Sequence, residues 1–159
     1  MKITIVCVGK VKEKYLHDAI AEYEKRLNRY CRLQVIEVAD EKTPDGASAV
    51  VEDQIREKEA ERILKNLRPD DPVVTLEIEG KQMDSVAFAQ KIEQMGVEGV
   101  SHIQFVIGGS LGLHEKVSKV SGWKLSFSQM TFPHQLMRVI LLEQIYRGYR
   151  IINGEPYHK

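Results

Sequence analysis

The last third of the chain carries two short loops whose residue types suit ligand binding. The first, 108–112 (Gly-Gly-Ser-Leu-Gly), follows an apolar run, and its glycines allow a sharp bend and the close approach of another group. The second, 126–133 (Ser-Phe-Ser-Gln-Met-Thr-Phe-Pro), offers hydroxyls, an amide and aromatic rings that could enclose an adenine. Because each loop lies between a strand-like and a helix-like run, we expect both loops to form one pocket.

Each loop also has a purely structural interpretation. The glycines are equally consistent with a tight turn from strand to helix. Thr131 or Ser128 could cap the helix that Pro133 opens. The first loop is neither a GxGxxG fingerprint nor a GK[ST] loop, and it comes late in the chain, so a nucleotide-phosphate site is weakly supported.

Two ionisable residues begin the helix that follows these loops. His134 and Arg138 are four residues apart and share one face of a helix predicted over 133–148. That helix is apolar nearly all round, which predicts burial on all sides, within the domain or against a second copy. A cationic pair there suits an anion or a ligand rich in acceptors. The commoner alternative pairs Arg138 with a nearby glutamate and satisfies His134 in the core.

The chain ends in Tyr157, His158 and Lys159, which combine an aromatic face, a group that titrates near neutrality and a cation. For most proteins such an ending is a frayed terminus. The last helix and tail are also basic, so we expect an anionic partner to approach there. Over 134–159, two acidic residues, Glu143 and Glu155, face a larger basic set of Arg138, Arg147, Arg150 and Lys159.

Alternating segments must position these residues. Short β-branched or aromatic runs predict strands at 2–8, 33–39, 72–78, 103–107 and 123–127. Apolar residues at helical spacing predict helices over 13–30, 48–67, 85–95 and 133–148. The alternation predicts an α/β fold with a mainly parallel sheet and helices on both faces. Ligands bind beyond the carboxyl ends of such strands, which is where both loops start.

Composition narrows the class of protein. A length of 159 residues is typical of one domain, 1–159. The 23 basic residues balance the 23 acidic ones, so the net charge does not indicate a nucleic-acid partner. Cys7 and Cys31 form no Cys/His cluster, which predicts reduced thiols, no metal site and a cytoplasmic protein. The longest aliphatic run, 139–142, is too short to span a membrane, so we expect no membrane partner.

The chain resembles the ribosomal RNA large subunit methyltransferase H family, which belongs to the SPOUT class of knotted methyltransferases. The likeness extends over the whole chain and is carried by 105–112, 125–134, Arg138-Val139 with 143–147, and 154–159. It implies a single α/β domain with a C-terminal trefoil knot that works as a homodimer. It also implies S-adenosylmethionine-dependent methylation of N3 of a pseudouridine in 23S rRNA, on the assembled 70S ribosome.

The resemblance also assigns roles to individual residues. The target base would be faced by His134, Arg138, Tyr157 and His158, with the tail completing the neighbouring protomer's site. We hypothesise that Arg138 stabilises the oxygens of the imide anion, while His134 or His158 helps to remove the N3 proton. The cofactor would be held by the end of the third strand and both loops, through Leu76, Gly108, Phe127, Ser128, Gln129, Met130, Thr131 and Phe132.

Two other functions stay open at the level of sequence. One is a nucleotide-binding α/β oxidoreductase or phosphotransferase that uses 108–112, although the chain lacks the early glycine fingerprint and a phosphate-binding lysine. The other is a ribosome-associated binding protein without catalysis, whose ribosome binding would be indifferent to S-adenosylmethionine. Neither explains the second loop as well.

Overall fold

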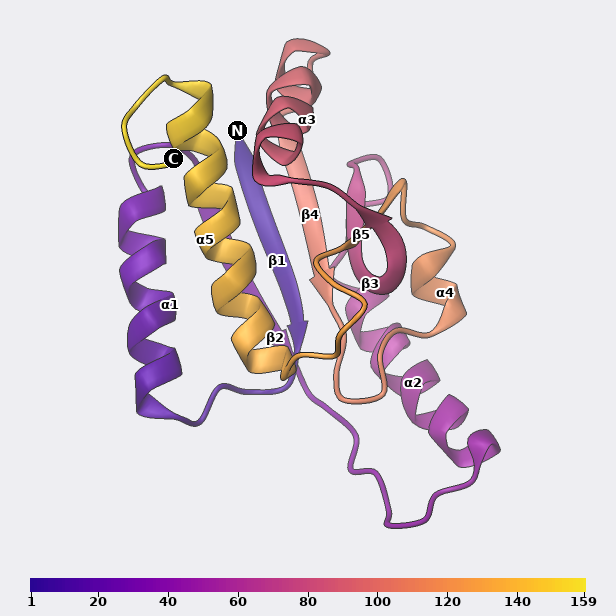
Figure 1. Ribbon diagram of the computed structural model, residues 1–159. Coiled ribbons are helices and arrows are strands. Elements are labelled where there is room, and N and C mark those ends of the chain that lie inside the picture. The colour runs from indigo at the N-terminus through magenta and orange to yellow at the C-terminus, as the bar shows by residue number, and fades with distance from the viewer.

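The computed structural model describes residues 1–159 as strands and helices that alternate along the chain (Figure 1). All predicted strands and helices are present, and only the one-turn helix α4 was not predicted. The ends differ most at β3 and α5, which both continue beyond the predicted limits. The elements are β1 (Lys2–Val8), α1 (Lys14–Leu27), β2 (Arg32–Val38), α2 (Ala49–Leu64), β3 (Val73–Gln82), α3 (Ser85–Val97), β4 (His102–Ile107), α4 (Glu115–Ser118), β5 (Trp123–Ser126) and α5 (His134–Ile152).

The strands form one parallel sheet in the order β2-β1-β4-β3-β5. Strand β1 pairs with β2 on one side and with β4 on the other, so that Ile3 lies beside both Leu33 and Ile103. Strands β4, β3 and β5 are direct neighbours. Their carboxyl ends therefore lie side by side, although they are far apart in the sequence. The predicted mainly parallel α/β sheet is confirmed.

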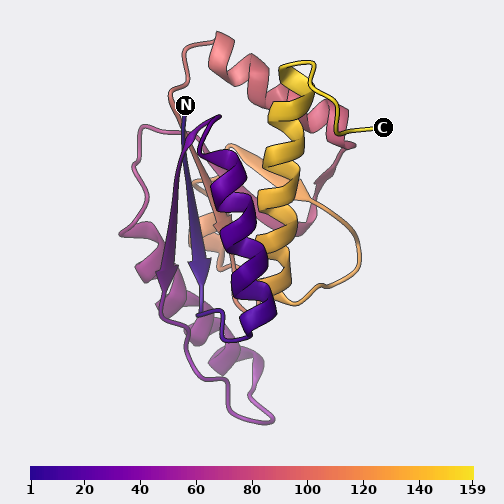
Figure 2. The same cartoon turned by 90° about the vertical axis from the view of Figure 1, so that its left-hand side faces the viewer.

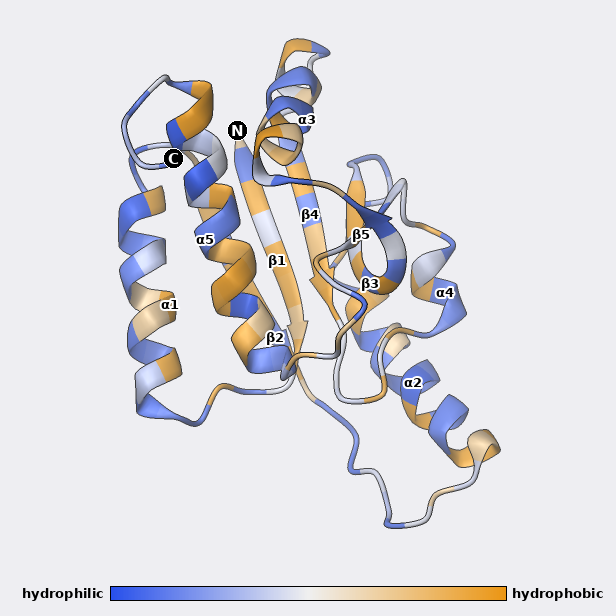
Figure 3. Ribbon diagram, in the orientation of Figure 1, coloured by the Kyte–Doolittle hydropathy of each residue, from blue (hydrophilic) through white to orange (hydrophobic).

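Helices cover both faces of the sheet, as predicted (Figures 1 and 2). On one face, α1, α3 and α5 pack over a core that includes Ile20, Phe88 and Leu141 together with Ile5 and Phe105 of the central strands. On the other face, α2 and α4 cover a smaller core of mostly valine side chains. The central strands β1 and β4 are accordingly hydrophobic along most of their length (Figure 3). The burial of both faces explains their continuous apolar sequences.

A bulge interrupts β3 at the edge where the predicted loops meet. Leu76 and Lys81 both lie opposite Leu125 of β5, so residues 77–80 leave the ladder and form a loop. Gly80 closes this loop against the neighbouring strand, because a Cβ atom there would lie 2.7 Å from the carbonyl carbon of Lys124. Such bulges redirect side chains away from the regular strand pattern. Here the redirected residues are Glu77, Ile78 and Glu79.

Helix α5 lies between α1 and α3 on one face of the sheet (Figures 1 and 2). It continues past Gly148 to Ile152, and a Cβ atom on Gly148 would be in ordinary contact with α3, 3.7 Å from the Cα of Ala89. Its inner side is buried, but Leu136 is 37% exposed and Val139 and Ile140 are half-buried. A single chain therefore does not bury this helix on all sides.

Polar side chains of β1 and β4 connect the opposite end of the sheet to the loop before β3. The amide of Gln104 accepts from the backbone of Arg68 and donates to the carbonyls of Arg68 and Asp71. The ring of His102 lies 2.7 Å from Asp71 and 2.8 Å from Thr4. These bonds stabilise the end of the sheet remote from the loops. None of the helices combines the length and the apolar character that crossing a bilayer requires.

Candidate functional site

A cavity of about 900 Å³ opens at the carboxyl ends of β3, β4 and β5. Parallel strands bring their carboxyl ends to one edge, which explains why three sequence-distant loops meet there. Two further residues, Arg56 of α2 and Met137 of α5, complete the wall. Most of the lining comes from four segments, 76–79, 107–113, 125–128 and 130–134.

The glycine loop lines this cavity and is also a tight turn. The Gly112 amide donates to the Gly109 carbonyl over 3.1 Å. A Cβ atom on Gly108 would lie 3.0 Å from both the backbone of Gly112 and the side chain of Leu113. Gly112 itself adopts a φ of 80°, which favours glycine. The two interpretations of this loop are therefore compatible: it turns tightly, and its bare backbone faces the cavity.

The second loop is held by its own serines. The Ser126 hydroxyl donates to the Ser128 carbonyl over 3.0 Å, and the Ser128 hydroxyl accepts from the Met130 amide over 2.9 Å. Neither Ser128 nor Thr131 caps α5, because Pro133 occupies the cap position without a side-chain hydrogen bond. The capping alternative is therefore wrong, and these side chains remain free to line the cavity.

The structure brings nearly all the predicted cofactor residues together. Gln129 is exposed and does not line the cavity, whereas its neighbour Met130 does. The role of each residue in binding stays a prediction, but their shared position agrees with it. Those that line the cavity are Leu76, Gly108, Phe127, Ser128, Met130, Thr131 and Phe132.

His134 is the ionisable group of α5 that lines the cavity. Its ring packs beside the end of β1, where Nε2 lies 3.5 Å from the position that a Cβ atom would take on Gly9. Burial lowers the pKa of His134, and the nearby positive charge of Arg138 lowers it further, while Asp40 acts weakly in the opposite direction. His134 is therefore neutral at physiological pH and can accept a proton.

Arg138 lies one turn further along α5 and is only 3% exposed. Its Nη1 donates to Glu37 over 2.6 Å, and its Nη2 donates to the Gly9 carbonyl over 3.2 Å. Its Nε is buried without a partner. The alternative that paired Arg138 with a glutamate describes this arrangement, and Arg138 does not line the cavity. In the isolated chain, the guanidinium fixes α5 to the ends of β1 and β2.

The C-terminal tail folds back on the other half of α5. The Tyr157 hydroxyl donates to Glu143 over 3.0 Å, and His158 Nδ1 lies 3.1 Å from Nη1 of Arg147. Burial raises the pKa of Tyr157, and its bond to Glu143 raises it further. The tail is thus attached rather than frayed. Glu143, which binds the tail, is nine residues from His134 along α5. Within one chain, the predicted base-facing residues of the tail therefore lie about 13 Å along the helix from His134.

His158 lines a second, smaller cavity of about 420 Å³ with Asp84, Ser85 and Gln144. This cavity shares Leu125 and Phe127 with the larger one. The two cavities therefore lie on either side of the end of β5. Tyr157 lines neither of them.

Comparisons with known proteins agree with this geometry. A family model described as "Predicted SPOUT methyltransferase" matches residues 1–158. The chain belongs to the SPOUT methyltransferase family. Proteins named ribosomal RNA large subunit methyltransferase H from Bifidobacterium adolescentis and Clostridium tetani are 64% and 60% identical to it, and each alignment covers 100% of both chains. The resemblance inferred from the sequence is thereby confirmed.

A solved structure shares the fold of this SPOUT methyltransferase. It is a "probable methylase family protein" from Haemophilus influenzae, with a TM-score of 0.56 and 16% sequence identity. The match covers 99% of this chain and 70% of that one. At this identity the comparison supports the α/β architecture alone.

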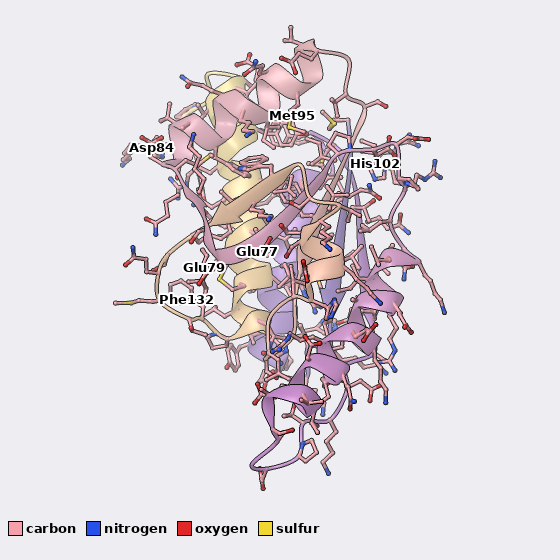
Figure 4. The ribbon with its side chains drawn as sticks, turned by 90° about the vertical axis from the view of Figure 1, so that its right-hand side faces the viewer. Glu77, Glu79, Asp84, Met95, His102 and Phe132 are labelled. Carbon is pink, nitrogen blue, oxygen red and sulfur yellow. The ribbon has the colours of Figure 1, made fainter.

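Sequence reasoning missed three charged residues of the cavity of this SPOUT methyltransferase. Arg56 reaches it from α2, and Glu77 and Glu79 enter it from the β3 bulge. Figure 4 shows the two glutamates near Phe132 of the second loop. Glu77 could have been predicted, because it lies near the carboxyl end of the strand expected at 72–78, and ligands bind at that end of a parallel sheet. No local pattern indicated Arg56.

Proposed function

We propose that this SPOUT methyltransferase transfers a methyl group from S-adenosylmethionine to N3 of a pseudouridine in 23S rRNA, on the assembled 70S ribosome. The observation that carries the proposal is the cavity of about 900 Å³ built by the end of β3 and the two loops after β4 and β5. Relatives that match along their full length are named as large-subunit rRNA methyltransferases, which supports rRNA as the substrate. We expect the enzyme in the cytoplasm, with its ribosomal substrate.

The residues of the cavity fit this cofactor better than a nucleotide polyphosphate. Apolar side chains such as Leu76 and Phe132, together with bare glycine backbone, suit an adenosine group. Phosphates would need cations, but Arg56 is the sole lysine or arginine of the lining, and it already lies 3.7 Å from Asp53. Two carboxylates in the wall favour a ligand with positive charge. These features argue against the phosphotransferase and dinucleotide alternatives.

When bound, the cofactor supplies an already activated methyl group, so catalysis depends mainly on the position of the nucleophile and the exclusion of water. The N3 atom of pseudouridine carries an imide proton that must leave. We assign this proton to His134, which lines the cavity and is kept neutral by burial and by Arg138. Within one chain His134 lines this cavity, whereas His158 would reach such a cavity only in a second protomer.

For Arg138, the geometry favours an indirect role over direct contact with the imide oxygens. Both terminal nitrogens of its guanidinium already donate hydrogen bonds within the protein. Arg138 is 3% exposed and does not line the cavity, so contact with an imide anion would require its side chain to leave this position. A positioned charge that lowers the pKa of His134 needs no such movement.

We further propose that the enzyme is a homodimer with a C-terminal trefoil knot, in which Tyr157 and His158 act in the neighbouring protomer's site. Two observations support the dimer. Apolar side chains of α5, among them Leu136, remain exposed or half-buried in one chain. The tail residues lie away from His134 in their own chain, so a second copy offers a route by which both groups meet one target base.

Methyl transfer to ribosomes tests the proposal. Labelled S-adenosylmethionine is incubated with the protein and with purified 70S ribosomes that lack the modification, or with free 23S rRNA. We expect incorporation at a single pseudouridine and a strong preference for ribosomes. Cofactor binding without incorporation would reassign the substrate. Ribosome binding that is indifferent to the cofactor, without incorporation, would favour the non-catalytic alternative.

A further inference from the structure

The charge of the cavity wall is unbalanced. Its formal charges are Glu77 and Glu79 against Arg56, while His134 is neutral for the reasons given above. The charge of Arg56 is also shared with acidic residues outside the cavity, since it lies 3.9 Å from Glu52 and 3.7 Å from Asp53. The wall is therefore acidic overall.

Glu77 differs from Glu79 in how firmly it is held. The Thr75 hydroxyl donates to Glu77 Oε2 over 2.6 Å, and the Ser118 hydroxyl donates to Glu77 Oε1 over 2.7 Å. Two hydroxyl donors, one on each oxygen, hold the carboxylate group in one orientation. Thr75 is itself fully buried and lies 2.8 Å from the Ser121 hydroxyl, which anchors it to the start of β5. The side chain of Glu79 is exposed and makes no hydrogen bond or ion pair within the chain.

The β3 bulge gives the carboxylate this position. Leu76 is still paired with β5, and Glu77 is the first residue to leave the ladder. Glu77 is therefore next to a rigid strand, and it is bonded to hydroxyls from β3 and from α4. A charge that is fixed in advance interacts with a ligand without the cost of reorganisation. Figure 4 shows Glu77 and Glu79 as neighbours at this edge.

We propose that Glu77 recognises the sulfonium charge of the cofactor and thereby makes the site prefer S-adenosylmethionine over its demethylated product; this inference rests on the proposed function. S-adenosylmethionine carries a sulfonium, an ammonium and a carboxylate, so its net charge is one positive unit. S-adenosylhomocysteine retains the ammonium, the carboxylate and the ribose but has a neutral thioether. A fixed carboxylate near the sulfur therefore distinguishes the two ligands by charge alone.

The preference has a consequence for turnover. Methyl transfer removes the positive charge from the sulfur and leaves Glu77 without its counter-charge. The product then binds less tightly than the substrate, which favours its exchange for a new cofactor. A binding site can distinguish two similar ligands by leaving a group unpaired with one of them, as well as by attracting the other.

Calorimetric titration of the full-length protein with each ligand tests this inference. We expect Glu77→Gln to weaken binding of S-adenosylmethionine by about tenfold or more and to change binding of S-adenosylhomocysteine much less. Ser118→Ala, which keeps the charge but removes one of its fixing bonds, should give a smaller loss of the same kind. The ratio of the two dissociation constants is the decisive readout.

Two charge-matched controls complete the design. Glu98→Gln changes the same charge at the exposed end of α3, outside the cavity, and should leave both dissociation constants unchanged. Glu79→Gln changes an exposed charge of the cavity wall and should alter the ratio less than Glu77→Gln does. Equal effects of the Glu77 and Glu79 variants would mean that net charge alone matters, and would overturn the specific role of Glu77.

Other outcomes are equally decisive. An equal loss for both ligands with Glu77→Gln would indicate a contact with the ribose or the ammonium group, or a purely structural role, and would overturn the sulfonium assignment. Circular dichroism shows whether that variant is folded, and Ser118→Ala provides the test if it is not. Failure of the unaltered protein to bind S-adenosylmethionine would overturn the proposed function itself, whereas normal binding with an unchanged ratio in Glu77→Gln would overturn only this inference.

Discussion

Glu37 and Arg138 form an ion pair of 2.6 Å that joins the end of β2 to the N-terminal half of α5. The arginine side chain is 3% exposed and the glutamate side chain 39% exposed, so one partner is buried and the other reaches solvent. The Val11 amide also donates to the same carboxylate oxygen over 3.3 Å. The pair and the Val11 amide thus connect β2, α5 and the segment between β1 and α1 at the end of the sheet that holds the cavity.

We predict that Glu37→Gln destabilises the protein by about 1–3 kcal/mol, because it leaves the buried guanidinium without its counter-charge. Urea unfolding at neutral pH measures the change. Glu22→Gln, which removes an exposed partner of Arg26, is the matched control and should cost well under 1 kcal/mol. A loss as small for Glu37 as for Glu22 would contradict a structural role for the pair.

The same pair predicts a pH dependence of stability. Burial of Glu37 opposes its ionisation, but hydrogen bonds from Arg138 and Val11 outweigh this effect and hold its pKa below the ordinary value of 4.5. Its contribution is therefore complete above pH 4.5 and is lost as the pH falls through the lowered pKa. Unfolding free energies between neutral pH and pH 3 should fall more steeply for the unaltered protein than for Glu37→Gln.

His134 gives a prediction for the pH dependence of methyl transfer. Its pKa is lowered from 6.5, chiefly by burial, so the base stays neutral at pH 6.5 and the rate falls only at lower pH. Removal of the opposing charge with Asp40→Asn should move this acid limb to still lower pH. Nuclear magnetic resonance titration of the His134 imidazole measures this pKa directly. The control is His17→Gln, which changes an exposed histidine of α1. An acid limb that persists in His134→Gln would rule out His134 as its source.

Gly80 gives a prediction for the β3 bulge. We expect Gly80→Ala to cost about 1–3 kcal/mol, because its Cβ would lie 2.7 Å from the backbone of Lys124 and force the strands apart. Cofactor affinity should fall with stability, since the bulge carries Glu77 to the cavity. Gly122→Ala is the control, because a Cβ at that position meets nothing within 4 Å. Thermal unfolding and calorimetric titration measure both effects.

The proposed sharing of sites between protomers predicts complementation. His134→Ala and His158→Ala are each expected to reduce methyl transfer strongly. Co-expression of the two variants should restore about a quarter of the activity, because half of the dimers are mixed and each mixed dimer holds one intact site. Purification by two different affinity tags isolates the mixed dimer. If both residues acted within one chain, co-expression would restore nothing.

Much of the fold and part of the site follow from the sequence alone. Runs such as 2–8 and 103–107 are apolar at most positions because both sheet faces are buried, and this local pattern predicts a parallel sheet with helices on either side. The same local pattern located both loops, because it showed where the strands before them end. The residue types of 126–133 also indicated a ligand site, and most of them line the cavity.

The partners of individual side chains were decided only by the tertiary structure. Glu37 is 101 residues from Arg138, and they meet because β2 and the start of α5 lie at the same edge of the molecule. The looped-out residues 77–80 follow from the register between β3 and β5, which no local spacing encodes. The position of the tail against Glu143 likewise depends on how the chain turns after α5.

The physical reason is the range of the interactions. Hydrophobic periodicity reports which side of a helix or strand is buried, and it can be read from neighbouring residues. Strand order, register and ion pairing depend on contacts between distant segments, which a single sequence specifies only through the free energy of the whole fold. The sequence therefore determined the class of protein and the place of its site, and the tertiary structure determined which charges face the ligand.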